Sequence, residues 1–221
     1  LSLHDALPIS NSTVGHGLNV APSFVIIKNR SNSYNWAVLH TSVGTTGTTL
    51  DGSAEYYMLQ LDSNAAINNF TNDNIWAPTN STFKINGSGT GNWVNANGDN
   101  YIAYCFAPVE GFSAMGSYVG NGSADGPFVS LSFAPKWVMI KGNNSSSWLI
   151  VDSARDSTNV ISDYLVANLT DAENYQAAWN WMDFLSNGFK QRNNGSWHNY
   201  ANITYYYLAF AEHPFKTARA R

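Results

Sequence analysis

Two glutamates hold equivalent places in this sequence and are its best candidates for acid–base chemistry. Glu110 follows the strand-like segment 101–107, and Glu212 follows the similar segment 205–211. Glycoside hydrolysis needs two carboxylates roughly 5–10 Å apart, one acting as acid and the other as nucleophile or base. The simpler interpretation is that each glutamate marks a strand end and points into water. The sequence therefore assigns no catalytic residue, and the pair supports only an alternative function, an enzyme that cuts polysaccharide.

Other catalytic and metal-binding patterns are weaker. The segment 152–156 (DSARD) places Arg155 between Asp152 and Asp156, which predicts a loop salt bridge that fixes a local turn. The sequence contains no Gly-x-Ser-x-Gly nucleophile elbow. The histidines lack zinc-ligand spacing, and the single cysteine, Cys105, excludes an internal disulfide and a cysteine-based zinc site. We therefore expect no metal and no cofactor.

The composition indicates a polar, nearly neutral surface. Charged residues make up 12% and aromatic residues 14% of the 221 residues, and the formal net charge is -4. A nucleic-acid partner would need clustered Lys and Arg, and a membrane span would need a long apolar run, so we expect neither. Asn, Ser and Thr are abundant. Together with the aromatic and β-branched residues they predict a turn-rich, all-β domain.

The elements that must position any site occur twice in the chain. The matched segments are 21–28 with 134–141, 36–40 with 148–152, Tyr57 and Leu59 with Tyr164 and Val166, 83–84 with 189–190, and 101–107 with 205–211. Ordered internal similarity of this kind indicates a duplication. We predict an all-β fold, an antiparallel β-sandwich built from two duplicated halves of about 105 residues each.

Each half consists of short apolar runs separated by turn residues. Segments 24–28 and 36–40, joined by the polar loop 29–35, have the pattern of a β-hairpin. Because both faces of these runs are apolar, we expect central strands that are covered on both sides. The segment 101–107 is of the same kind. Residues 170–182 combine a capping box with near-helical spacing, and we expect at most one helical turn there.

We divide the chain into a leader and two repeats. Residues 1–10 (LSLHDALPIS) resemble translated sequencing-adaptor sequence, so we leave them out of the fold. The first β repeat then spans residues 11–118 and the second spans residues 119–221. The two repeats form either one sandwich or two.

The aromatic side chains fall into two groups. Those that recur in both halves are best explained by packing, and they are Trp36, Trp148, Phe24, Trp137, Tyr57, Tyr164, Phe106 and Phe210. Those in polar loops are our candidates for ligand binding, and they are Tyr34, Trp93, Tyr118, Trp179, Trp181 and Trp197. Aromatic faces beside Asn, Asp and Ser side chains can bind sugar rings and hydroxyls.

Six longer motifs carry a family resemblance. They are 101–112 (YIAYCFAPVEGF), 117–128 (SYVGNGSADGPF), 133–141 (FAPKWVMIK), 152–156 (DSARD), 185–190 (LSNGFK) and 210–215 (FAEHPF). Over residues 13–221 the chain resembles a domain family common in tail-fibre and other virion-associated proteins of aquatic bacteriophages. The resemblance implies a virion or extracellular location and symmetric oligomers, with bacterial surface glycans and other virion or fibre proteins as partners. It implies no catalytic residues.

From the resemblance and the polar surface we expect a non-enzymatic tail-fibre or virion-surface domain that binds host envelope carbohydrate. One alternative is a passive structural subunit of a virion or extracellular fibril, pairing through sheet edges. The other is an envelope polysaccharide depolymerase that uses Glu110 and Glu212.

Overall fold

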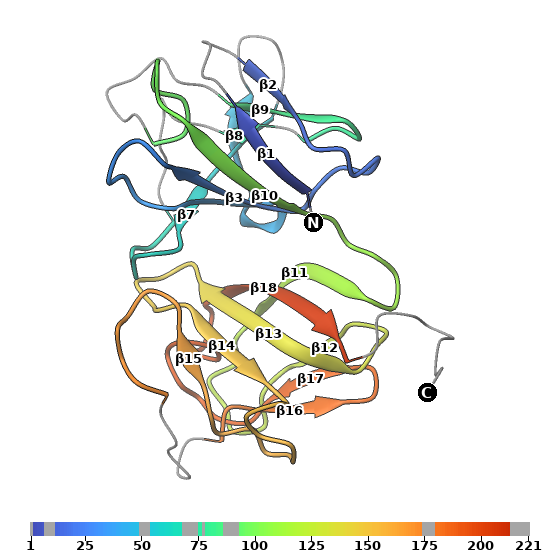
Figure 1. The fold of residues 1–221 in the computed structure, drawn as a ribbon. Helices are drawn as coiled ribbons and strands as arrows, with labels where there is room; N and C mark the ends of the chain where they lie inside the picture. Colours follow the sequence, from blue (N-terminus) through green and yellow to red (C-terminus); the bar gives the residue numbers. More distant parts are fainter. Residues whose placement is uncertain are drawn as a thin grey trace. The chain divides into compact units, whose positions relative to one another are not determined.

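The chain folds into two compact units of β-strands. The computed structural model describes residues 2–6, 12–48, 54–67, 75–76, 78–85, 93–173 and 180–212. The units are Leu1–Ala107 (unit 1) and Pro108–Arg221 (unit 2), and most of their strands are labelled in Figure 1. Within the described residues the only other regular element is a single 3-10 turn, Thr41–Val43 (η1), which confirms the all-β prediction. No helix of these residues is long and apolar enough to cross a membrane.

Unit 1 contains two antiparallel sheets. The first has the order β1-β10-β3-β4-β7 and consists of β1 (Ser2–Ala6), β10 (Tyr101–Phe106), β3 (Phe24–Asn29), β4 (Ala37–His40) and β7 (Met58–Gln60). The second has the order β2-β9-β8-β6-β5 and consists of β2 (Ser12–Gly15), β9 (Thr82–Ile85), β8 (Ile75–Trp76), β6 (Ala54–Tyr56) and β5 (Thr45–Thr48).

The inner strands of the first sheet are the runs that are apolar on both faces. β3 pairs with β10 and β4, and β4 pairs with β3 and β7, so both edges of each strand are hydrogen-bonded. This confirms the predicted hairpin of central strands. Val25, Ile27 and Leu39 from this sheet form one buried cluster with Phe83 and Ile85 of β9. The core of unit 1 therefore draws on both of its sheets.

Unit 2 also contains two antiparallel sheets. The larger has the order β11-β18-β13-β14-β15 and consists of β11 (Ser113–Val119), β18 (Thr204–Ala211), β13 (Pro135–Gly142), β14 (Leu149–Asp152) and β15 (Leu165–Val166). The smaller has the order β12-β17-β16 and consists of β12 (Phe128–Ser130), β17 (Gly188–Gln191) and β16 (Met182–Leu185).

The core of unit 2 draws on both of its sheets. Side chains alternate faces along a strand, so Tyr205, Tyr207 and Ala209 of β18 point the same way. They form one buried cluster with Val129 of β12 and Phe189 of β17. In Figure 1 the strands β13, β14 and β18 are drawn above β16 and β17 within this unit.

A tyrosine at the start of the last strand of each unit holds the loop before it. The Tyr101 hydroxyl accepts a hydrogen bond from the backbone N–H of Ala96 at 2.7 Å. The Tyr205 hydroxyl accepts one from the N–H of Tyr200 at 2.9 Å and donates to the Ser196 carbonyl at 2.9 Å. In both units the amide lies five residues before the tyrosine. Burial raises the pKa of each phenol to about 12, so both hydroxyls stay protonated.

Replacing Tyr205 by phenylalanine is expected to destabilise the chain by about 1–3 kcal/mol. The ring would still fill its buried place, but the Tyr200 amide and the Ser196 carbonyl would lose their hydrogen-bond partner, and partly buried groups that lose a partner cost free energy. Urea unfolding of Tyr205→Phe measures this cost. Tyr200→Phe, at a side chain that is 57% exposed, is the control and should change stability little. Equal stability of the two variants would contradict the assigned role.

A second pair of hydrogen bonds recurs at the β-hairpin of each unit. The backbone N–H of Trp36 donates to the Asp62 carboxylate at 3.1 Å, and the N–H of Trp148 donates to the Asn168 side-chain oxygen at 2.8 Å. Each acceptor follows the strand that pairs with the second hairpin strand, β7 in unit 1 and β15 in unit 2.

The predictions for individual segments have mixed outcomes. Residues 2–6, which the sequence analysis left out of the fold, pair with β10 as β1. No helical turn forms in the described part of 170–182, where Met182 begins β16. Of the recurring aromatic residues, Phe24, Trp148 and Tyr164 are buried, whereas Trp36, Trp137, Tyr57, Phe106 and Phe210 are half-buried.

Candidate functional site

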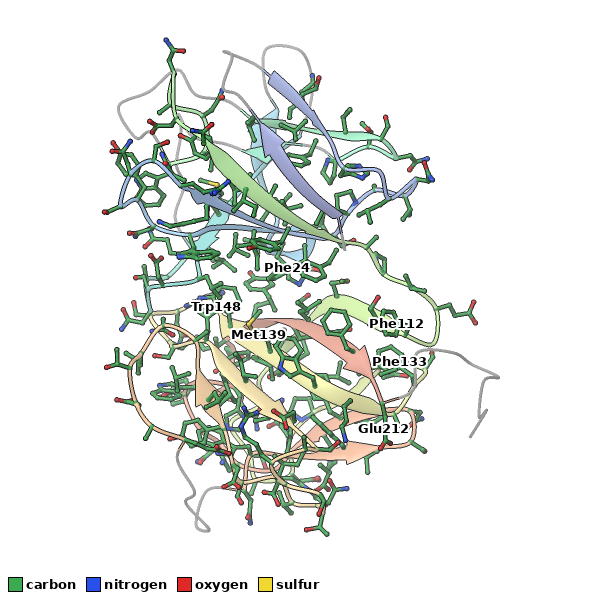
Figure 2. The ribbon with its side chains drawn as sticks, viewed as in Figure 1. Phe24, Phe112, Phe133, Met139, Trp148 and Glu212 are labelled. Atoms are coloured by element: carbon green, nitrogen blue, oxygen red, sulfur yellow. The ribbon has the colours of Figure 1, made fainter. Side chains whose placement is uncertain are left out.

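The strand ends of unit 2 surround a hollow of about 360 Å³. It lies where β13 begins and where β14 and β18 end, beside the turn between β16 and β17. Its polar lining includes Lys136, Ser153, Asp156, Thr158, Ser186 and Glu212. The half-buried Phe184 and Leu185 supply apolar surface. Figure 2 labels Glu212 at this end of the unit.

Backbone hydrogen bonds hold the three strand ends together. The N–H of Ser153 donates to the Lys136 carbonyl, and the N–H of Glu212 donates to the Ala134 carbonyl, each at 3.0 Å. These bonds continue the pairing of β13 with β14 and β18 past the last paired residues. The polar side chains at the rim therefore stand on an ordered frame.

The turn after β14 is fixed by its own charged side chains. Asp152 accepts hydrogen bonds from the N–H groups of Ala154 and Arg155, at 2.9 and 3.0 Å. Arg155 forms an ion pair with Asp152 and a second one with Glu173 at 3.1 Å. This confirms the predicted loop salt bridge. The fixed turn delivers the next residue, Asp156, to the hollow.

Asp156 is anchored through one carboxylate oxygen. Oδ2 accepts from the N–H and the hydroxyl of Ser162, at 2.7 and 3.0 Å, and from the N–H of Asp163 at 3.4 Å. No hydrogen bond joins Oδ1 to any residue that the structure describes. Partial burial raises the pKa of Asp163, and the Asp156 carboxylate raises it further. Asp156 thus presents an oriented oxygen that can accept hydrogen bonds from a ligand.

Asn159 holds the opposite wall of the hollow. Its amide donates to the Phe184 carbonyl at 2.8 Å and accepts from the Phe184 N–H at 2.9 Å, as a strand partner would. The result is a site with fixed oxygen acceptors, several hydroxyls, one ammonium group and an apolar wall. Such a site suits a ligand rich in hydroxyls. Within the described part of the chain, no three His, Cys, Asp or Glu side chains gather as metal ligands would.

Two of the predicted ligand-binding aromatics lie in unit 1. Tyr34 is half-buried and lines a second hollow, in the loop between β3 and β4. Trp93 is half-buried and packs against the core of unit 1. Trp179 falls outside the described residues.

Three others come together in unit 2, but inside it. Trp181 was expected in a polar loop, yet it directly precedes β16 and is only 2% exposed. Its ring stacks on Trp197 with centroids 6.4 Å apart, and Trp197 and Tyr118 pack against the core cluster. Tyr118 lies in β11, whereas Trp181 precedes β16 and Trp197 lies in a turn, and all three rings pack on the core although polar residues flank them in the sequence. At their positions they contribute packing.

Tyr118 belongs to a closed ring of buried hydrogen bonds. Its hydroxyl donates to the His198 carbonyl at 2.6 Å and accepts from the Gln191 amide at 2.9 Å. The Gln191 oxygen accepts from Nδ1 of His198 at 2.6 Å, because an amide oxygen can only accept. Burial lowers the pKa of His198 to about 3 and raises that of Tyr118 well above 10. This ring ties β11 and β17 to the loop before β18.

The two glutamates singled out for acid–base chemistry are placed differently. Glu212 lines the hollow, whereas the exposed Glu110 is not among its lining residues. The carboxylate that accompanies Glu212 there is Asp156, which the sequence analysis had assigned only to a turn. The motifs 133–141, 152–156, 185–190 and 210–215, which carry the family resemblance, all contribute lining residues. Their convergence on one site is visible only in the folded chain.

Comparison with known proteins gives one match. No curated protein and no solved structure matches the chain. A family model described as a domain of unknown function (DUF7483) matches residues 8–214, which is nearly the whole sequence. The chain therefore belongs to this family of domains of unknown function, DUF7483.

Proposed function

We propose that the hollow of unit 2 binds carbohydrate of the bacterial envelope and that the chain is a non-enzymatic surface domain of a phage tail fibre or virion. The observation that carries the proposal is the hydrogen bonding of the Asp156 carboxylate. Three donors hold one of its oxygens, and the other is left as an acceptor at the hollow. An anchored carboxylate accepts hydroxyl hydrogen bonds without first losing side-chain entropy.

The surroundings of Asp156 fit a sugar. Ser153, Thr158 and Ser186 offer hydroxyls that both donate and accept, which matches the hydroxyl groups of a saccharide. Phe184 and Leu185, both half-buried, give apolar surface for the C–H face of the ring. The low charge of the chain, 12% Asp, Glu, Lys and Arg, limits unspecific attraction to charged surfaces. The virion setting rests on the sequence motifs that resemble phage fibre proteins. The same motifs are the basis for proposing other fibre proteins as partners and a symmetric oligomer.

We also infer that the two units arose by duplication and that each is a two-sheet β-sandwich. The paired hydrogen bonds of Tyr101 and Tyr205, and those of Trp36 and Trp148, support this inference. So does the strand order shared by the first sheet of unit 1 and the larger sheet of unit 2, in which the last strand of each unit lies next to the first strand of the hairpin. Such agreement in backbone detail is difficult to obtain by convergence, since loops vary most readily.

Asp156→Asn is expected to lower affinity for envelope polysaccharide about 10- to 100-fold, which is the loss of one hydrogen bond to a charged acceptor. The asparagine oxygen can still accept from Ser162, so the loop should keep its structure, while an amide replaces the free oxygen at the hollow. Retention of the purified chain on immobilised envelope polysaccharides measures the affinity. Asp171→Asn, an exposed acid outside the hollow, makes the same charge change and is the control.

Assaying released reducing sugar ends in the same retention experiment distinguishes the other functions. If new reducing ends form with the chain but not with Glu212→Gln, the chain is a depolymerase and the non-enzymatic binding function is rejected. Assembly into polymers without any glycan, with no retention on any envelope, would favour a structural subunit. Equal retention of Asp156→Asn and Asp171→Asn would reject the hollow as the binding site.

A further inference from the structure

A second hollow, of about 580 Å³, lies on the hairpin loop of unit 1. It is lined by the loop between β3 and β4 together with Asp62, and the side chains that matter most are Lys28, Arg30, Ser33, Tyr34 and Asp62. It is separate from the site of unit 2 and shares no residue with it.

The loop that forms this hollow is pre-organised. The side-chain oxygen of Asn29 accepts from the N–H groups of Ser31 and Asn32, at 2.8 and 2.9 Å. The amides of Asn29 and Asn32 donate to Asp99, at 2.7 Å from Asn29 and at 2.8 and 3.0 Å from Asn32. The Asn100 N–H donates to the Ser31 hydroxyl at 2.9 Å. A ligand would therefore meet a surface already fixed in shape, which lowers the entropic cost of binding.

The equivalent place in unit 2 is closed by the protein itself. Asn168, which takes the place of Asp62, donates its amide to the Ser147 hydroxyl at 3.3 Å. In unit 1, Oδ1 of Asp62 accepts from Trp36, while no described residue bonds to Oδ2, and the side chain is exposed. In unit 2 the Asn168 amide therefore has a partner within the protein, whereas in unit 1 Oδ2 of Asp62 remains an open acceptor.

The lysine at the end of the first hairpin strand shows the same contrast. Lys141 is fully buried and donates to the carbonyls of Gly142 and Asn144, at 3.1 and 2.9 Å. Lys28 is half-buried, donates to the Tyr34 carbonyl and lies 5.9 Å from the centre of the Trp36 ring. This end of the hairpin borders a hollow in unit 1, whereas the matching lysine of unit 2 is buried. The hairpin loop of unit 1 places Arg30 and Tyr34 at the hollow.

The charges of the two hollows differ in sign. Among its lining residues the unit 1 hollow has two cations, Lys28 and Arg30, and one carboxylate, Asp62, while the nearby Asp99 carboxylate is taken up by the amides of Asn29 and Asn32. The unit 2 hollow has one cation, Lys136, against the carboxylates of Asp156 and Glu212. An anionic ligand group is therefore favoured in unit 1 and disfavoured in unit 2.

We propose that the unit 1 hollow is a second saccharide site, and that it takes an acidic sugar unit carrying a carboxylate or a phosphate. Arg30 and Lys28 receive the anionic group, the open oxygen of Asp62 accepts a hydroxyl, and the Tyr34 ring supplies an apolar face. The inference rests on the proposed carbohydrate function. It adds that the chain selects envelope polysaccharides whose repeats contain acidic units.

The test uses three polymers of similar length, namely a neutral dextran, a polygalacturonate and a poly(glycerol phosphate). Arg30→Gln is expected to weaken binding of an acidic polymer about 5- to 10-fold, as the loss of one partly exposed charged contact, and to leave dextran binding unchanged. Comparing polygalacturonate with poly(glycerol phosphate) shows whether the site prefers a carboxylate or a phosphate. Lys84→Gln removes the same charge from β9, outside both hollows, and is the matched control.

The outcomes separate this inference from the proposed function. Equal weakening by Arg30→Gln and Lys84→Gln would show unspecific attraction and overturn the second site. So would acidic-polymer binding that neither variant changes. If dextran binding depends on Asp156 while no acidic polymer binds, the inference fails and the proposed function stands. If the chain binds none of the three polymers and no envelope polysaccharide, both the second site and the proposed function are rejected. Circular dichroism of each variant confirms that the fold is retained.

Discussion

Acidification from pH 7.5 to 5 is expected to lower the free energy of unfolding by about 2 kcal/mol through His198 alone. Burial lowers the pKa of this imidazole to about 3, whereas in the unfolded chain it is about 6.5. Between these values the unfolded state holds one proton more than the folded state, so stability falls as pH falls. The loss approaches about 1.4 kcal/mol per pH unit and totals about 4 kcal/mol by pH 3.

The surroundings of the ring explain why protonation is so unfavourable. Nδ1 is held by Gln191, and no described residue gives Nε2 a hydrogen-bond partner. The Trp181 ring lies edge-on with its centroid 4.8 Å away. A proton on Nε2 would place a charge in this enclosed, largely apolar space.

Urea unfolding at several pH values measures this effect against His198→Gln, which cannot titrate. The variant is expected to be less stable at pH 7.5 but to lose about 2 kcal/mol less on going to pH 5. That interval lies above the usual range of carboxyl groups, so the difference isolates the imidazole. Parallel pH dependences of the two proteins would show that His198 is accessible to protons in the folded chain.

Replacing Phe189 by alanine is expected to destabilise the chain by about 3–5 kcal/mol. Phe189 is fully buried in the core of unit 2, where its ring meets Tyr118 and Tyr207 edge-on, with centroids 6.0 and 5.6 Å away. The aromatic neighbours belong to different strands of the larger sheet, so they cannot all collapse into the space left behind. A lower urea midpoint with an unchanged slope would report this loss of packing.

Phe128→Ala provides the matched control on the neighbouring strand. Phe128 is 45% exposed on β12 and pairs with Lys190, next to Phe189 on β17. The same truncation there should cost about 1 kcal/mol or less. If Phe189→Ala were as mild as Phe128→Ala, the two sheets of unit 2 would not share the single core described above.

The sequence was sufficient for inner strands such as β3 and β4 because their signal is local, but it missed the edge strand β1. Runs such as 24–28 combine β-branched and aromatic residues, are bounded by turn residues, and became inner strands as predicted. Trp181 shows the limit of the same reasoning. Its neighbours Asn180 and Asp183 suggest a polar loop, but the register of the adjoining strand turns the ring into the core.

The candidate site could not be assembled from the sequence because its members come from four separated segments. Asp156 was assigned to a turn, and the neighbouring Asp152–Arg155 salt bridge is indeed there. That Asp156 also meets Glu212 around one hollow depends on how β14 and β18 flank β13. The longer motifs were the available signal in the sequence. Sequence patterns alone do not show that these motifs meet at one place in the fold.

The way in which the unit 2 hollow is fastened has a consequence for adaptation. Its wall is held by Asp152, Asp156 and Asn159, through bonds that end on backbone atoms, on Ser162 or on the Arg155 side chain. No hydrogen bond in the described part of the chain involves the exposed side chains of Ser157, Thr158 or Ser186, which line the same hollow. Selection, or a combinatorial library, can therefore vary these three positions and shift ligand preference at little cost in stability.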